Sequence, residues 1–128
     1  MGKTLAMVFG WIFVVVGVLG FFSNPIVGSA PGAIFAADTI HNLVHLVSGI
    51  VFLWVAYGAP MKAGAVMKIF GVVYLLVALL GFLTISGTGS LLGIMLTNAA
   101  DNWLHLVLGI VILGAGLKAG KPMTAQSM

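Results

Sequence analysis

Cysteine is absent from this chain and charged residues are scarce, and each shortage excludes a class of protein. Without cysteine, neither a disulfide framework nor a thiolate metal site can form. Only 5% of the 128 residues are charged, whereas soluble domains carry about 25%. The five lysines are too few and too scattered to form a nucleic-acid-binding surface. We therefore expect neither a disulfide-stabilised secreted domain nor a protein that binds nucleic acid.

Apolar residues are abundant instead, at 62% of the chain with a mean hydropathy of +1.26. A soluble fold of this length could not bury that much apolar surface. Lipid permits only helices or closed barrels, and the apolar runs are too long and too uniform for barrel strands. Each run approaches the ~20 residues that a helix needs to cross ~30 Å of hydrocarbon. The four runs are Leu5–Phe22, Thr39–Tyr57, Ala65–Leu83 and Ala99–Leu117. We expect an all-α membrane protein, embedded in lipid as one domain (1–128).

The lysines predict the orientation of the four spans. They flank the N-terminus, the middle loop and the C-terminus, and are Lys3, Lys62, Lys68, Lys118 and Lys121. The other two loops, 23–38 and 84–98, contain none. Because cytoplasmic loops carry the excess of lysine, we expect a multi-pass protein of the cytoplasmic (inner) membrane with both termini and the polar tail (118–128) in the cytoplasm. The apolar stretches 33–37 and 91–96 would either lie in the outer interface as short amphipathic turns or dip slightly inward.

The second half of the chain repeats the first. The segment His41–Ile50, HNLVHLVSGI, aligns with Asp101–Ile110, DNWLHLVLGI, at an offset of 60 residues that relates His45 to His105. The first and third spans align at an offset of 61. These matches predict two helical-hairpin repeats of the same topology, about 5–57 and 65–117, related by an axis along the membrane normal. We expect a four-helix bundle in which spans two and four are pseudo-twofold partners.

Polar side chains gather on one face at the outer ends of spans two and four. Their spacing of i, i+3, i+4 and i+7 places each set on a single helix face. The first set is Asp38, His41, Asn42 and His45, and the second is Asn98, Asp101, Asn102 and His105. We expect the two faces to lie opposite each other across the axis and to form one polar network.

Three of these residues have a structural explanation. Asp38 and Asn98 are typical helix N-caps, and Asp101 stands three residues after Asn98 as in a capping box.

His41 and Asp101 occupy equivalent positions, where they could form an ion pair across the bundle. Asn42 and its equivalent Asn102 could likewise hydrogen-bond across the axis.

His45 and His105 lie about 10 Å deeper than the caps, where an imidazole needs a partner or water. Each precedes a glycine by four residues, Gly49 or Gly109, which leaves room for a close helix or for a flat ring. The pair could hydrogen-bond to neighbours and specify the bundle. It could instead bind a metal ion, a haem or a chlorophyll-type pigment, or serve a proton or ion pathway between protomers.

The strings His41–Leu46 and Asp101–Gly109 resemble the two hallmark segments of a bacterial membrane family catalogued as domain of unknown function 4383. The resemblance runs from about Met7 to Leu117 and includes the order of the spans. It implies a small four-helix bacterial membrane protein and supplies no activity. Its hallmark positions coincide with the polar face.

Catalysis is not expected, because the sequence shows no nucleophile–base pair, no phosphate loop and no paired carboxylates. The seven methionines are scattered, without a copper-like cluster. Small size and the lack of a soluble domain favour an accessory protein that self-associates or joins a larger membrane complex. The alternatives are a cofactor carrier that uses His45 and His105, and a proton or ion pathway between protomers.

Overall fold

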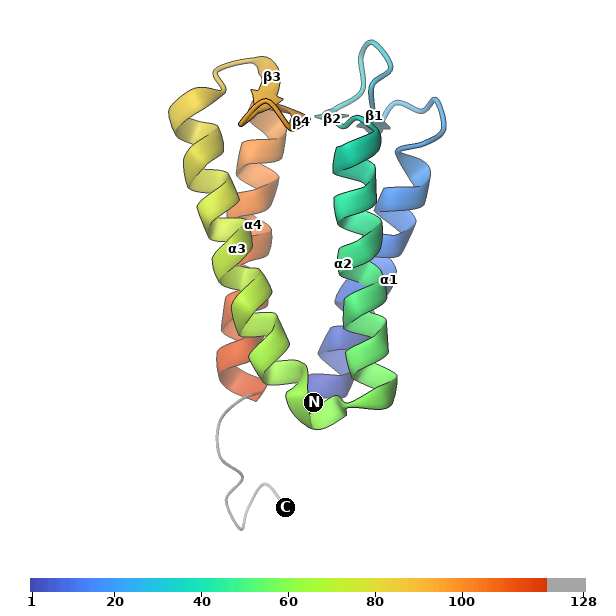
Figure 1. The fold of residues 1–128 in the computed structure, drawn as a ribbon, viewed down its shortest axis with the longest axis vertical. Helices are drawn as coiled ribbons and strands as arrows, with labels where there is room; N and C mark the ends of the chain where they lie inside the picture. Colours follow the sequence, from blue (N-terminus) through green and yellow to red (C-terminus); the bar gives the residue numbers. More distant parts are fainter. Residues whose placement is uncertain (120–128) are drawn as a thin grey trace.

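Four helices form two antiparallel hairpins that stand side by side in a computed structural model describing residues 1–119 (Figure 1). They are α1 (Gly2–Leu19), α2 (Thr39–Gly58), α3 (Ala63–Thr84) and α4 (Ala99–Ala119). Each is long and apolar enough to cross a membrane, so the predicted all-α membrane fold is confirmed. The part of the expected tail beyond Ala119, including Lys121, lies outside the described residues.

Helix α1 differs most from its predicted bounds, because it begins and ends three residues earlier than the apolar run Leu5–Phe22. The Asn24 side chain explains the early end. Its amide donates to the Leu19 carbonyl at 2.9 Å, while its oxygen accepts from the backbone N–H of Val27 at 2.9 Å. Asn24 thus fixes a turn that the apolar character of the run does not reveal.

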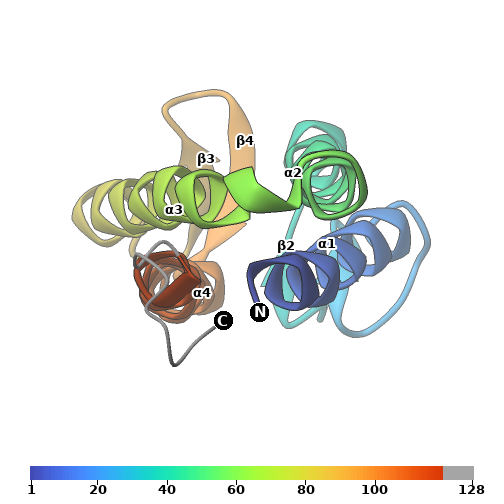
Figure 2. The same cartoon turned by 90° about the horizontal axis from the view of Figure 1, so that it is seen from below.

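The start of α1 and the end of α4 lie at the same end of the bundle as the link between α2 and α3 (Figures 1 and 2). That link is a single 3₁₀ turn, Pro60–Lys62, whose proline cannot continue α2 because it lacks a backbone N–H. We call this end the lysine end, because Lys3, Lys62, Lys68 and Lys118 belong to the segments that meet there. The opposite end carries four short strands and is called the strand end.

The two loops at the strand end contain short paired strands in place of the predicted amphipathic turns. Strands β1 (Val27–Gly28) and β2 (Phe35–Ala36) pair in parallel. Strands β3 (Thr88–Leu91) and β4 (Met95–Asn98) form an antiparallel hairpin. Backbone groups close to lipid must be satisfied internally, and pairing the apolar segments satisfies them where an isolated turn would not.

Within each hairpin, small residues let the helices approach closely. A Cβ added at Gly49 would lie 2.7 Å from the Gly10 carbonyl oxygen, and one at Gly71 would lie 2.5 Å from the Leu113 nitrogen. Such close approach is the usual basis of helix pairing in membranes, where lipid removes the hydrophobic driving force. Glycine therefore holds α1 against α2 and α3 against α4.

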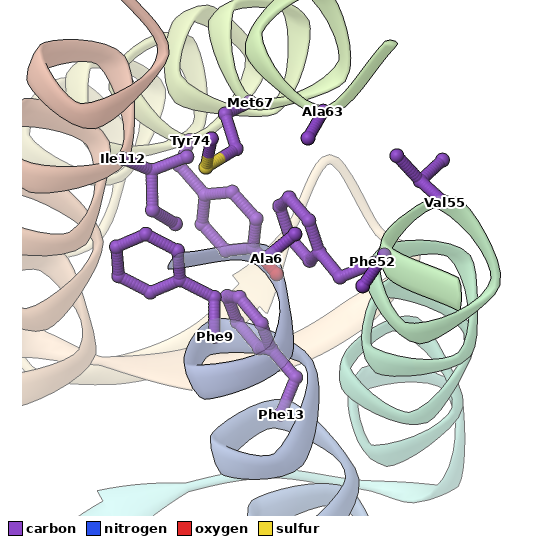
Figure 3. Packing of buried hydrophobic residues seen from close by; sticks show 10 residues of the cluster. Ala6, Phe9, Phe13, Phe52, Val55, Ala63, Met67, Tyr74 and Ile112 are labelled. Atoms are coloured by element: carbon purple, nitrogen blue, oxygen red, sulfur yellow. The ribbon is translucent and has the colours of Figure 1, made fainter. Parts of the chain in front are cut away.

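Between the hairpins, the space that separates the ribbons in Figure 1 is filled by large side chains (Figure 3). Phe13 lies at their centre, with ring centroids 5.8 Å from Phe52 and 5.3 Å from Tyr74. Met67 and Ile112 from the second hairpin are fully buried in the same cluster. This apolar core joins the two hairpins below the strand end.

Candidate metal centre

The first turns of α2 and α4 are capped as expected from the sequence. An Asp38 carboxylate oxygen accepts from the His41 N–H at 3.0 Å. Asn98 Oδ1 accepts from the Asp101 N–H at 2.9 Å, and Asp101 Oδ2 accepts from the Asn98 N–H at 3.0 Å, which is a reciprocal capping box. These caps set where each helix begins and so which residues face the bundle interior.

The predicted ion pair between His41 and Asp101 does not form. His41 Nδ1 instead lies 2.7 Å from the Leu96 carbonyl oxygen of β4, and its Nε2 has no partner among the described residues. Asp101 uses one oxygen in the capping box, and its Oδ1 is likewise buried without a partner. His41 and Asp101 therefore do not pair, although they occupy equivalent positions in the repeat. The His41 ring binds the Leu96 carbonyl of β4, and the Asp101 carboxylate caps α4.

The predicted hydrogen bond between Asn42 and Asn102 is also wrong. Each asparagine side chain fills the space above a glycine of its own hairpin, Asn42 beside Gly20 and Asn102 beside Gly81. Asn102 Nδ2 donates to the Ile85 carbonyl at 3.3 Å. Asn102 thus bonds within its own hairpin, and Asn42 packs within its own hairpin while its Oδ1 is buried without a partner among the described residues.

Three histidines meet at the interface between the hairpins. His41 and His45 stand one turn apart on α2, and His105 reaches them from α4. Their ring centroids are 4.6 Å apart for His41–His45, 5.5 Å for His41–His105 and 6.3 Å for His45–His105. All three are at most 2% exposed, and one ring nitrogen from each lies within 4.8 Å of the other two.

The sequence prediction paired His45 with His105 and placed His41 among the surrounding polar groups. The structure brings His45 and His105 together and adds His41 as the third member. The spacing of His41 and His45 predicted a shared helix face, and the signal not drawn from it is that two imidazoles four residues apart also occur in helical zinc-binding motifs.

Hydrogen bonding fixes the protonation of His41. A carbonyl oxygen can only accept, so the His41 Nδ1 that faces Leu96 carries a proton, and in the neutral ring Nε2 presents a lone pair. Metal-binding histidines are typically oriented by such an N–H bond to a backbone carbonyl. His45 Nδ1 and His105 Nδ1 are also buried without partners, and each such atom costs about 1–3 kcal/mol if left unsatisfied.

A cavity of about 150 Å³ opens beside the three imidazoles. Ligand pockets for larger molecules span about 300–1,000 Å³. The sequence left open whether Gly49 and Gly109 make room for a close helix or for a flat ring, and in the structure neighbouring helices cover both glycines. A Cβ at Gly49 or Gly109 would lie 2.7 Å from Val14 or Leu75, respectively. A haem or chlorophyll-type pigment, one of the alternatives for the histidine pair, is therefore too large for this cavity, whose volume would accommodate a single ion.

A family model described as domain of unknown function 4383 (DUF4383) matches residues 3–118. The chain belongs to this family. The match includes every residue of the histidine cluster and extends the resemblance seen in the sequence over all four helices. No curated protein and no solved structure matches the chain.

Aromatic residues close the histidine cluster of this DUF4383 member on its inner side. The Phe13 ring centroid lies 5.9 Å from that of His45, and the Tyr74 ring centroid lies 5.7 Å from that of His105. The Tyr74 hydroxyl donates to Ser48 Oγ at 3.4 Å, and Ser48 donates to the Val44 carbonyl at 2.7 Å. Beyond this point the apolar core begins (Figure 3).

Proposed function

We propose that this DUF4383 protein is a small accessory membrane protein that binds one transition-metal ion through His41, His45 and His105. The observation that carries the proposal is the convergence of three buried imidazoles from two hairpins, with ring nitrogens that have no protein partner. A metal ion bound by one nitrogen of each ring would hold the three imidazoles together. Imidazole is a good ligand for zinc, copper, iron and nickel.

The spacing of the ring nitrogens supports this assignment. Ligands 2.0–2.1 Å from a tetrahedral zinc ion lie about 3.3 Å from one another. The three nitrogens already lie within 4.8 Å of each other. Side-chain rotations that draw the rings together by about 1.5 Å or less would complete the site. The proton held by the Leu96 carbonyl leaves His41 Nε2 ready to coordinate.

A bound ion would also act as a clamp, because His41 and His45 come from α2 while His105 comes from α4. Binding to the folded state alone stabilises a protein by about 2.7 kcal/mol when the free metal exceeds Kd a hundredfold. The proposed role is therefore structural, as a metal-dependent tie between the hairpins at the strand end.

We propose further that the protein is not itself an enzyme. Ser48 and Tyr74 are the hydroxyl-bearing residues of the cavity lining, but Tyr74 donates its proton to Ser48 and Ser48 donates to the Val44 carbonyl, so neither proton is directed to a histidine. Nucleophilic catalysis requires a base that takes the proton of the nucleophile. The Ser48 geometry thus supports a binding role.

The lysines support an orientation with the lysine end in the cytoplasm and the strand end outside, in the cytoplasmic (inner) membrane. This assignment would place the metal centre near the extracytoplasmic surface. The accessory role includes association with a second copy or with a larger membrane complex. A groove on α2 lined by Ile50, Leu53, Trp54, Tyr57 and Gly58 supports such contacts, because the side chains of Ile50, Trp54 and Tyr57 are more than half exposed.

Metal analysis of the purified full-length protein tests the proposal. We expect one ion per chain after equilibration with Zn²⁺, Co²⁺, Ni²⁺ or copper, and at least a hundredfold weaker binding in His41→Ala, His45→Ala and His105→Ala. Asp101→Asn is the matched control, because Asp101 is equivalent to His41 but lies outside the cavity lining. A wild-type protein that retains none of these metals, or His→Ala variants with unchanged affinity, would refute the proposal.

A further inference from the structure

The walls of the cavity restrict which metal the histidine cluster can hold. Besides the three imidazoles, the lining contains one thioether and a set of mostly apolar side chains. The complete lining is His41, Val44, His45, Ser48, Phe70, Val73, Tyr74, Val77, Met95 and His105. The two acidic residues of the sequence, Asp38 and Asp101, are absent from it. All the strong metal donors at the site are therefore neutral.

Neutral donors in an apolar cavity favour a cation of low charge. The idealised cost of moving an ion from water into an apolar medium grows with the square of its charge, so a divalent ion costs about four times as much as a monovalent one. A divalent ion such as Zn²⁺ would bring a second positive charge that no side chain of the cavity lining offsets. Copper(I) is the monovalent transition-metal ion that both imidazole and thioether groups bind well.

Met95 is positioned by the same strand that orients His41. It lies in β4, where it pairs with Leu91 across the hairpin. The next residue, Leu96, provides the carbonyl oxygen that holds His41 Nδ1. The backbone that sets the His41 ring thus also carries the Met95 side chain to the cavity wall, on the strand-end side of the imidazoles.

We infer that the ion at this site is copper(I), coordinated by His41, His45 and His105 with the Met95 thioether as a fourth ligand. The inference rests on the proposed metal-binding function and specifies its chemistry. Three nitrogens and one sulfur around copper(I) satisfy the buried imidazoles without placing a second uncompensated positive charge among Phe70, Val73 and Val77.

Competition titrations under anaerobic conditions test this assignment. The full-length protein in detergent is titrated with copper(I) against a chromophoric copper(I) chelator, and separately with Zn²⁺ against a zinc indicator. We expect copper(I) to bind at least a hundredfold more tightly than Zn²⁺. Met95→Leu should weaken copper(I) binding about tenfold or more and change Zn²⁺ binding less than threefold, since leucine keeps the volume but removes the sulfur. Met61→Leu, at a methionine that is 99% exposed, is the control and should change neither.

X-ray absorption at the copper edge gives an independent readout on the unmodified protein. Copper(I)-loaded protein should show one sulfur ligand together with nitrogen ligands, and Met95→Leu should lose the sulfur. Zn²⁺ binding as tight as that of copper(I) would overturn the copper assignment, and a copper environment without sulfur in the wild-type protein would overturn the Met95 ligand. A protein that binds neither ion would overturn the proposed function itself.

Discussion

The two hairpins are alike where helices pack and unlike where polar groups meet. Gly20 contacts Asn42 in the first hairpin as Gly81 contacts Asn102 in the second, at positions related by the sequence repeat. By contrast, His41 binds the Leu96 carbonyl while its equivalent, Asp101, caps α4.

This difference makes the centre asymmetric. The first hairpin contributes two imidazoles, whereas the second contributes one imidazole and, through β4, the oxygen that orients His41. A strictly symmetric pair of hairpins would place a fourth histidine at 101 and would lose the capping box at the start of α4. The divergence of one residue therefore explains both the helix cap and the composition of the histidine cluster.

The largest expected effect of a substitution falls on the shared packing. In Gly49→Ala the new methyl group meets the Gly10 and Val14 backbones at 2.7 Å, so α1 and α2 must separate. We expect the free energy of unfolding to fall by about 3 kcal/mol, and by about 2 kcal/mol for the equivalent Gly109→Ala, which meets the more adaptable Leu75 side chain first. Denaturation in mixed detergent micelles measures both.

Gly114→Ala is the control for these variants, because nothing lies within 4 Å of its added Cβ. Alanine should leave stability unchanged or raise it by up to about 1 kcal/mol through helix propensity. Equal effects of Gly49→Ala and Gly114→Ala would show that the close approach of α1 and α2 is wrong.

Substitutions at the two helix caps should lower the free energy of unfolding by smaller and unequal amounts. Asp38 accepts one hydrogen bond, whereas Asn98 and Asp101 exchange two. Asp38→Ala should therefore cost about 1 kcal/mol and Asn98→Ala about 2 kcal/mol, measured in the same unfolding assay. Asp38→Asn retains an acceptor oxygen and should cost little. An Asn98→Ala cost below that of Asp38→Ala would contradict the capping box.

The smallest effect concerns Tyr74, whose equivalent in the first hairpin is Phe13. Tyr74→Phe makes the two positions identical and removes only a long hydrogen bond to Ser48, which keeps its bond to Val44. We expect a loss of about 0.5 kcal/mol in the free energy of unfolding. Metal affinity should change less than threefold, and a larger change would place the Tyr74 hydroxyl at the metal.

Sequence reasoning located the four helices because the thickness of the hydrocarbon imposes a length that apolar runs reveal directly. It missed the end of α1, where one side chain, Asn24, closes the turn. It also missed the strands, since segments such as Thr88–Leu91 are short and their pairing depends on residues several positions away.

For the site, the repeat and the helical spacing selected the right polar residues but not their partners. Symmetry suggested that Asn42 would face Asn102, yet each turned to a glycine of its own hairpin. Which partner a side chain takes depends on differences of an ångström in helix separation, and spacing along one chain does not encode them. Met95 was passed over for the same reason, because only the β3–β4 hairpin brings it to the cavity wall.

The partner of His41 is a main-chain oxygen, which has an evolutionary consequence. Every amino acid brings a carbonyl, so mutational drift at position 96 leaves the acceptor in place and the imidazole tautomer unchanged. Only an alteration that shifts the path of β4, such as an insertion in its hairpin, would release the ring. The orientation of this histidine thus depends on the backbone path of the β3–β4 hairpin and not on the identity of any neighbouring side chain.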